Sequence, residues 1–146
     1  MTMTLQEISD RFEIMDVLTD YCSAIDAKDI DALDHIFTAD ACIDYSKAGG
    51  PKADLKTIKN FLQANLGDLP RQHSISNIKI QINGDSAQAR SLCHNPLELP
   101  SQGDVLEVVF WGLWYDDKLI RTPDGWRIQE KVTQPCYNWK MRRMAS

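Results

Sequence analysis

The change in hydrophobic period after Pro70 constrains the fold of this chain more than any other feature. Before Pro70, apolar residues recur at helical spacing, first at Leu5, Ile8, Phe12, Met15, Leu18, Cys22 and Ile25. After Pro70 the period becomes two, because Ile78, Ile80 and Ile82 alternate with polar residues up to the tight-turn signal Asn83-Gly84-Asp85. Helices followed by antiparallel strands are typical of an α+β domain.

Three helices are predicted in the first half of the chain. The first covers 5–28 and turns the apolar series given above inward. A short second helix fits 31–37, and we expect it to pack against the first as a hairpin. The third runs from 54 to about 66, where Gly67 and Pro70 end it.

Strands are predicted at 42–45, 78–82, 87–97, 105–115 and 126–133. The strand 105–115 is apolar on both faces, with Val108, Phe110 and Trp114 on one and Val109, Trp111 and Leu113 on the other. Such a strand must be covered twice. We therefore expect a strongly curved, mainly antiparallel sheet with helices on one side, and a homo-oligomer, a dimer or trimer, joined through the sheet.

The size and charge of the chain narrow its class. A length of 146 residues suits one domain over 1–146. The net charge of −5 argues against nucleic acid as a partner, because neutralising phosphates needs a basic surface. Residues 1–6 lack a positive segment followed by an apolar stretch of signal-peptide length, and about 18 apolar residues nowhere run together, so we expect neither a signal peptide nor a membrane segment. We expect a cytoplasmic protein.

Asp26 and His73 are the candidate acid/base residues. Asp26 lies four residues after Cys22, so it falls on or beside the buried face of the first helix, near a C-terminus that disfavours negative charge. His73 opens a strand directly after a loop, and imidazole exchanges protons near neutral pH. Spacing alone favours plainer interpretations, a turn cap for Asp26 and a structural histidine for His73.

Other polar residues form a weaker set. Tyr21 and Tyr45 are phenols that can hold a substrate oxygen, although each alone is more often a packing residue. His35 and His94 are less favoured, because one lies on a short helix and the other alternates along a strand. Without paired histidine or cysteine spacing and without a glycine-rich nucleotide loop, no metal and no cofactor is expected. We interpret Cys22, Cys42, Cys93 and Cys136 as reduced core residues.

Several segments together resemble the SnoaL-like branch of the nuclear transport factor 2 superfamily. They are YCSAIDAKDIDAL at 21–33, FTADA at 37–41, IDY at 43–45, Gln72-His73, and DGWRI at 124–128. The resemblance covers nearly the whole chain and implies a cone-shaped α+β barrel, with three helices on a curved sheet. The pattern is most similar to scytalone dehydratase, bile acid 7-alpha-dehydratase and hexachlorocyclohexane dehydrochlorinase.

These enzymes share an Asp–His pair that acts without a cofactor, and by motif Asp26 and His73 occupy its two positions. Tyr21 matches a tyrosine of the bile acid enzyme, and Tyr45 matches a substrate-orienting tyrosine of scytalone dehydratase. Ile25 stands where scytalone dehydratase has a tyrosine. The second pocket histidine of scytalone dehydratase corresponds to a position near Leu97 of this chain. The resemblance thus implies a different substrate.

The resulting hypothesis is a dehydratase-like lyase. His73, oriented by Asp26, removes a proton beside a leaving hydroxyl or halide, and Tyr21 or Tyr45 assists the leaving group. The substrate is a small hydrophobic aromatic or alicyclic molecule, in a pocket lined by Phe61, Cys93, Asn95, Phe110 and Trp114. The alternatives are an isomerase with the same pair, a hydrophobic-ligand-binding or oligomerisation module, and a small subunit of a larger oxygenase.

Overall fold

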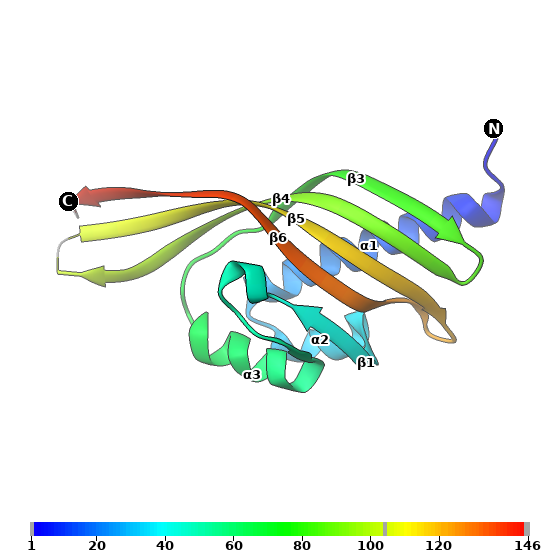
Figure 1. The fold of residues 1–146 in the computed structure, drawn as a ribbon, viewed down its shortest axis with the longest axis horizontal. Helices are drawn as coiled ribbons and strands as arrows, with labels where there is room; N and C mark the ends of the chain where they lie inside the picture. The colour runs from blue at the N-terminus through cyan, green and yellow to red at the C-terminus, as the bar shows by residue number, and fades with distance from the viewer. Residues whose placement is uncertain (1, 104, 145–146) are drawn as a thin grey trace.

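A computed structural model of the chain describes residues 2–103 and 105–144 (Figure 1). The elements are α1 (Leu5–Ala27), η1 (Ile30–Ala32), α2 (Leu33–Ile36), β1 (Phe37–Asp44), η2 (Ser46–Ala48), β2 (Lys52–Asp54), α3 (Leu55–Asn65), β3 (Ser74–Asn83), β4 (Ser86–Gln102), β5 (Val105–Thr122) and β6 (Gly125–Met144). The elements η1 and η2 are short 3-10 helices. The helices precede the long strands, as the change of period predicts.

The six strands form one mixed sheet in the order β2-β1-β6-β5-β4-β3. Only β1 and β6 pair in parallel, and the other neighbours are antiparallel. The sheet stays open, with β2 and β3 at its edges. The helices pack on one side of it, α1 against β6 and β3 and α3 against β1 and β2. The predicted α+β class, with three helices on a curved and mainly antiparallel sheet, is confirmed.

The strands run further than predicted. Figure 1 shows the end of β4, the start of β5 and the end of β6 continuing together past the helices, to the end of the molecule that carries the C-terminus. The sheet extends there because β4 and β6 pair with β5 on both sides, which supplies backbone partners even where no helix covers it. The first strand is also longer than the predicted 42–45 and takes up Phe37, which the sequence assigns to the second helix.

The inward face of α1 differs from the predicted one. Leu5, Ile8, Phe12 and Met15 are exposed, Phe12 to 63%. The buried residues of α1 are instead Asp10, Ile14, Leu18, Tyr21, Cys22, Ala24 and Ile25. The predicted apolar series advances about 3.3 residues per step, whereas an α-helix completes a turn in 3.6 residues. Toward the N-terminus the series therefore rotates away from the buried face of the helix. The prediction of inward-facing residues is correct only for Leu18, Cys22 and Ile25.

A buried carboxylate fixes the N-terminal half of α1. Asp10 accepts two hydrogen bonds of 2.7 Å from the Arg121 guanidinium on β5, and one of 3.2 Å from the Trp126 indole on β6. The Arg121 hydrogen bonds hold the pKa of Asp10 well below its usual range. This contact ties α1 to the β5–β6 turn.

The core lies between α1 and the inner face of the sheet. Its fully buried side chains include Ile14, Phe37, Ile43, Ile58 and Ile128. Of the four cysteines, which are all free, Cys22 and Cys93 are buried, but Cys42 and Cys136 are exposed and correct the prediction for that pair. Within the described residues, no helix combines the length and apolar character that a bilayer crossing needs.

Candidate active site

His73 and Asp26 are in direct contact. The Nδ1 atom of His73 lies 2.6 Å from Asp26 Oδ1, and the His73 backbone N–H donates to Asp26 Oδ2 at 2.8 Å. The imidazole side chain is 5% exposed and the carboxylate 24%. Because a carboxylate on Nδ1 requires a proton between the two atoms, Asp26 fixes the ring orientation and directs Nε2 away from itself. The predicted pair is therefore brought together, with the geometry of a base and its orienting carboxylate.

Backbone pairing places His73. The segment before β3 lies along β4, where Gln72 N donates to Pro96 O at 3.1 Å and Glu98 N donates to Pro70 O at 2.9 Å. The Arg71 side chain donates to carbonyls at the C-terminal ends of α1 and α3, including Ile25 O at 2.9 Å. A cation at these helix ends offsets the unfavourable position of the nearby Asp26 charge.

Asn95 on β4 occupies the other side of the His73 ring. Its amide group lies 2.9 Å from His73 Nε2. An amide can present either its oxygen or its NH₂ to the ring, and the surrounding hydrogen bonds decide between them. With Oδ1 toward Nε2, the NH₂ group donates to Gln72 O at 3.3 Å and Pro96 O at 3.2 Å. Only this orientation satisfies both ends of the amide.

Tyr21 and Tyr45 form a phenol pair at the same cavity. Their hydroxyl oxygens lie 2.7 Å apart, and both side chains are buried. Burial raises the pKa of Tyr21 and of Tyr45 above the ordinary value for tyrosine. Both therefore stay neutral near pH 7, and the hydroxyl that accepts within the pair keeps its own proton to donate to a substrate oxygen or halide.

A buried ion pair lies behind these rings. Lys131 Nζ is 3.1 Å from Asp117 Oδ1, with the two side chains 1% and 0% exposed. The ammonium group lies over the rings of Tyr21, at 4.1 Å from the centroid, and Tyr115, at 3.8 Å. These two rings meet edge to face, with centroids 5.7 Å apart. Lys131 thus holds both aromatic walls of the cavity by cation–π contacts.

The dyad opens on a cavity of about 470 Å³ whose walls are mainly apolar. Its lining includes Tyr21, Tyr45, Phe61, His73, Asn95, Leu97, Leu99, Trp111, Leu113, Tyr115, Thr133, Asn138 and Lys140. The predicted lining residues Phe61 and Asn95 are among them. The hydroxyl of Thr133 is buried and has no hydrogen-bond partner within the described residues.

The other predicted lining residues lie elsewhere. Phe110 and Trp114 are on the opposite face of β5, where Phe110 stacks on Trp139 with centroids 4.3 Å apart and Trp114 lies under Arg90. The cavity receives Val109, Trp111, Leu113 and Tyr115 from this strand. Cys93 points inward but is fully buried behind the cavity wall. These three placements correct the sequence prediction: alternation along a strand that is apolar on both faces does not tell which face is inside.

The two remaining histidines lie outside the cavity. His94 is on the outer face of the sheet, 3.4 Å from the Tyr137 hydroxyl, and His35 is exposed on α2. Across residues 2–103 and 105–144, no three His, Cys, Asp or Glu side chains are grouped so that they could hold a metal ion.

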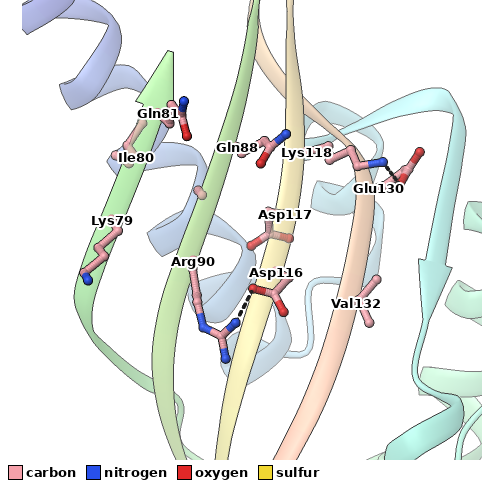
Figure 2. Close-up of a pocket in the computed structure, with 11 residues that line it drawn as sticks. Lys79, Ile80, Gln81, Gln88, Arg90, Asp116, Asp117, Lys118, Glu130 and Val132 are labelled. Carbon is pink, nitrogen blue, oxygen red and sulfur yellow. Dashed lines mark ion pairs between the residues drawn. The ribbon is translucent and has the colours of Figure 1, made fainter. Parts of the chain in front are cut away.

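The outer face of the sheet carries a second, polar hollow. Figure 2 shows this groove over β3 to β6, with an ion pair between Arg90 and Asp116 and another between Lys118 and Glu130. The side chains of Arg90, Asp116, Lys118 and Glu130 lie on the side of the sheet opposite His73. The groove is therefore separate from the dyad.

Sequence reasoning missed Arg71, Tyr115, Lys131 and Thr133. Lys131 and Asp117 are typical surface residue types, and only the pairing of β5 with β6 places them opposite each other and inside. Arg71 gave a weak signal, since it directly precedes the candidate Gln72-His73 and follows a helix end.

The comparisons with known proteins agree with this fold. The SnoaL-like domain model matches residues 6–132. The uncharacterized protein Rv2910c of Mycobacterium tuberculosis (strain ATCC 25618 / H37Rv) is 44% identical over 140 residues, which cover 95% of this chain and 94% of that protein.

Two solved structures are similar over nearly their whole length. The Kfla4162 protein from Kribbella flavida has a TM-score of 0.83 and 26% identity, covering 91% of this chain and 95% of that one. A hexachlorocyclohexane dehydrochlorinase, LinA type 2, shares the fold with a TM-score of 0.82 at 13% identity, covering 97% and 95%. Residues 6–132, which the SnoaL-like domain model matches, include both Asp26 and His73.

Proposed function

The chain belongs to the SnoaL-like domain family, and on that premise we propose that it is a cofactor-independent lyase acting on a small aromatic or alicyclic substrate. The observation that carries the proposal is the 2.6 Å contact between His73 Nδ1 and Asp26 Oδ1 at the wall of an apolar cavity. A carboxylate–imidazole pair at the wall of an apolar cavity, with the imidazole side chain 5% exposed, is an arrangement suited to proton abstraction from carbon.

The proposed reaction is an elimination. His73 accepts the proton of a carbon atom next to the one that bears a hydroxyl or halide, and the C–H electrons form the new double bond. Asp26 stabilises the imidazolium that results. Tyr21 or Tyr45, both neutral, donates a hydrogen bond to the leaving oxygen or halide.

The cavity supports the substrate class. A volume of about 470 Å³ suits a molecule of one to three rings, and Phe61, Trp111 and Leu113 offer apolar surfaces for it. The dehydrochlorinase with the same fold removes a chloride and a proton from a ring compound, as its name states. The likeness supports halide as well as hydroxyl as a leaving group.

The test is a screen in deuterated water. The purified protein is incubated with aromatic and alicyclic alcohols and halides that carry an acidic C–H beside the leaving group, and mass spectrometry follows both substrate and products. Loss of water or of hydrogen halide is the expected result. A product with the same elemental composition as the substrate but a different structure favours the isomerase, which uses the same dyad. A compound that binds but undergoes neither reaction favours a ligand-binding module.

We also propose that the chain forms a homo-oligomer through the outer face of the sheet. This face carries an aromatic patch of Phe110, Trp114, Tyr137, Trp139 and Met141, with Trp139 50% exposed. The neighbouring groove in Figure 2 pairs cations with anions, so two copies can approach without net repulsion. A second copy is the occupant that these features favour.

Sedimentation velocity at about 10 μM, well above the dissociation constant of a stable interface, checks this proposal. Wild-type protein is expected to sediment as a dimer or trimer, and Trp139→Lys with Met141→Lys is expected to yield monomer. The control is Phe12→Lys, which adds a positive charge at an exposed apolar residue of α1. A wild-type monomer contradicts the proposal, as does dissociation caused by Phe12→Lys alone.

A further inference from the structure

The inner face of β4, β5 and β6 continues from the dyad cavity onto the part of the sheet that projects past the helices (Figure 1). Three cross-strand rows follow one another along this face, starting beside His73. They consist of Asn95, Trp111 and Asn138, then Leu97, Val109 and Lys140, and last Leu99, Glu107 and Arg142. The first two rows line the dyad cavity, and the third is mostly charged. The face therefore changes from apolar to charged with distance from His73.

A second cavity, of about 570 Å³, lies against the outer rows. It shares Leu99 and Lys140 with the dyad cavity, so the two hollows are neighbours along the sheet. Lys140 lies two strands and one row away from Asn95, which is about 12 Å between Cα atoms at ordinary strand spacing. A ring compound with a short side chain spans that distance.

The charged side chains of this second cavity do not balance. The Glu107 carboxylate lies between two cations, with Arg142 Nε 2.5 Å from one oxygen and Lys140 Nζ 3.1 Å from the other. The hydrogen bonds from Arg142 and Lys140 lower the pKa of Glu107, so this group is charged at neutral pH. No other carboxylate is among the described residues that line the two cavities. Two cations and one anion leave a net positive charge.

Other cations near the dyad are already engaged. Lys131 is buried against Asp117. The Arg71 guanidinium donates to backbone carbonyls at the ends of α1 and α3. In contrast, Lys140 is 53% exposed and Arg142 73% exposed, and each has further N–H groups to donate beyond its contact with Glu107. An anion that enters the cavity mouth thus meets these two side chains.

We propose that the site takes ring compounds that carry a carboxylate on a short side chain, with the ring beside His73 and the carboxylate at Lys140 and Arg142. The inference rests on the proposed function, because it names the substrate class of the same site. Lys140 and Arg142 determine specificity and do not touch the reacting carbon. They donate charge-assisted hydrogen bonds that a neutral compound of the same shape cannot accept as strongly.

The test compares 4-(2-naphthyl)butanoate with its primary amide, which has the same shape without the charge. Isothermal titration calorimetry at about pH 7.5 gives both affinities, and the carboxylate is expected to bind about fivefold or more tightly. Raising sodium chloride from about 0.05 to 0.5 M is expected to reduce this ratio, because salt screens partly exposed charges.

Variants assign the preference to the proposed residues. Lys140→Met and Arg142→Met are each expected to lower the ratio of the two affinities, and the double variant is expected to bring it to about one. Glu107→Gln removes the competing carboxylate and is expected to raise the ratio, which no general damage to the site would do. Lys118→Met, at an exposed lysine on the outer face, is the matched control and should keep the wild-type ratio.

The proposal is overturned if the wild type does not bind the carboxylate or binds acid and amide equally. A preference that survives the Lys140→Met and Arg142→Met double variant overturns it as well. A preference that follows these variants, with no turnover of any compound, refutes the lyase function alone. Turnover of neutral ring compounds, without a preference for the acid, refutes the carboxylate site alone.

Discussion

Replacing His73 with Gln is expected to lower turnover by about 10³-fold or more, within the range of about 10² to 10⁴ that one acid/base group contributes. Gln fills a similar volume but cannot accept and return a proton at neutral pH. Steady-state rates on a substrate from the screen measure the effect. The matched control is His94→Gln, on the outer face of the sheet, which should keep the wild-type rate.

Asp26→Asn is expected to lower turnover by changing which ring nitrogen of His73 carries the hydrogen. An Asn side chain can still accept the His73 backbone N–H, but its NH₂ group would donate to Nδ1 and leave the ring hydrogen on Nε2. His73 would then have its lone pair on the wrong side of the ring. A loss of about 10²-fold or more in kcat is expected, with little change in substrate binding. Activity retained in both dyad variants would remove these residues from the mechanism.

Replacing Lys131 with Met is expected to lower the free energy of unfolding by about 3 to 5 kcal/mol, because it leaves a buried carboxylate without its partner. Asp117 is fully buried, and burial already raises its pKa above the usual value, against the opposing effect of Lys131. Loss of Lys131 also removes the cation that lies over two tyrosine rings. Urea unfolding followed by circular dichroism measures the change.

The pH dependence of this variant has a defined sign. Without Lys131, the pKa of Asp117 in the folded state rises further above the unfolded value of about 3.9. A raised carboxyl pKa contributes stability that is present at low pH and is lost as pH rises through the folded-state value. The deficit of Lys131→Met is therefore expected to be largest near neutral pH and to shrink as the solution is acidified toward the unfolded value.

Two control variants distinguish the effect of an unpaired buried charge from a general loss of stability on replacing a lysine. Lys118→Met removes an exposed lysine paired with Glu130 on the same sheet and should cost less than about 1 kcal/mol. Combining Lys131→Met with Asp117→Leu removes both buried charges and should recover most of the lost stability. Equal costs for Lys118→Met and Lys131→Met would mean that the buried pair has no special role.

The order of elements was accessible from the sequence because it follows from local periodicity. Helical spacing before Pro70 and alternation after it locate α1, α3 and the long strands. Their extent was less accessible: β6 runs to Met144 because β5 supplies a neighbour for it, and that pairing is not local. The inward face of α1 was misjudged at Phe12 because a series shorter than 3.6 residues per step drifts around the helix.

The site was recoverable only in part. Asp26 and His73 are 47 positions apart, and spacing alone left both with plain interpretations; the family resemblance joined them, and the structure places them in contact. Which face of β5 lines the cavity depends on curvature and helix packing, so Phe110 and Trp111 could not be told apart in advance. The burial of Lys131 follows from strand register, which could not be read from the sequence. Its residue type predicts exposure instead, because lysine is rarely buried.

Deuterium transfer at carbon is the most direct test of the account. The wild-type protein is incubated in deuterated water with a compound that it converts by elimination. We expect it to release the elimination product, or to return the compound with deuterium at the carbon next to the leaving group. His73→Gln and Asp26→Asn should show neither change, while His94→Gln should match the wild type. Elimination and exchange at the wild-type rate in both dyad variants would contradict the account.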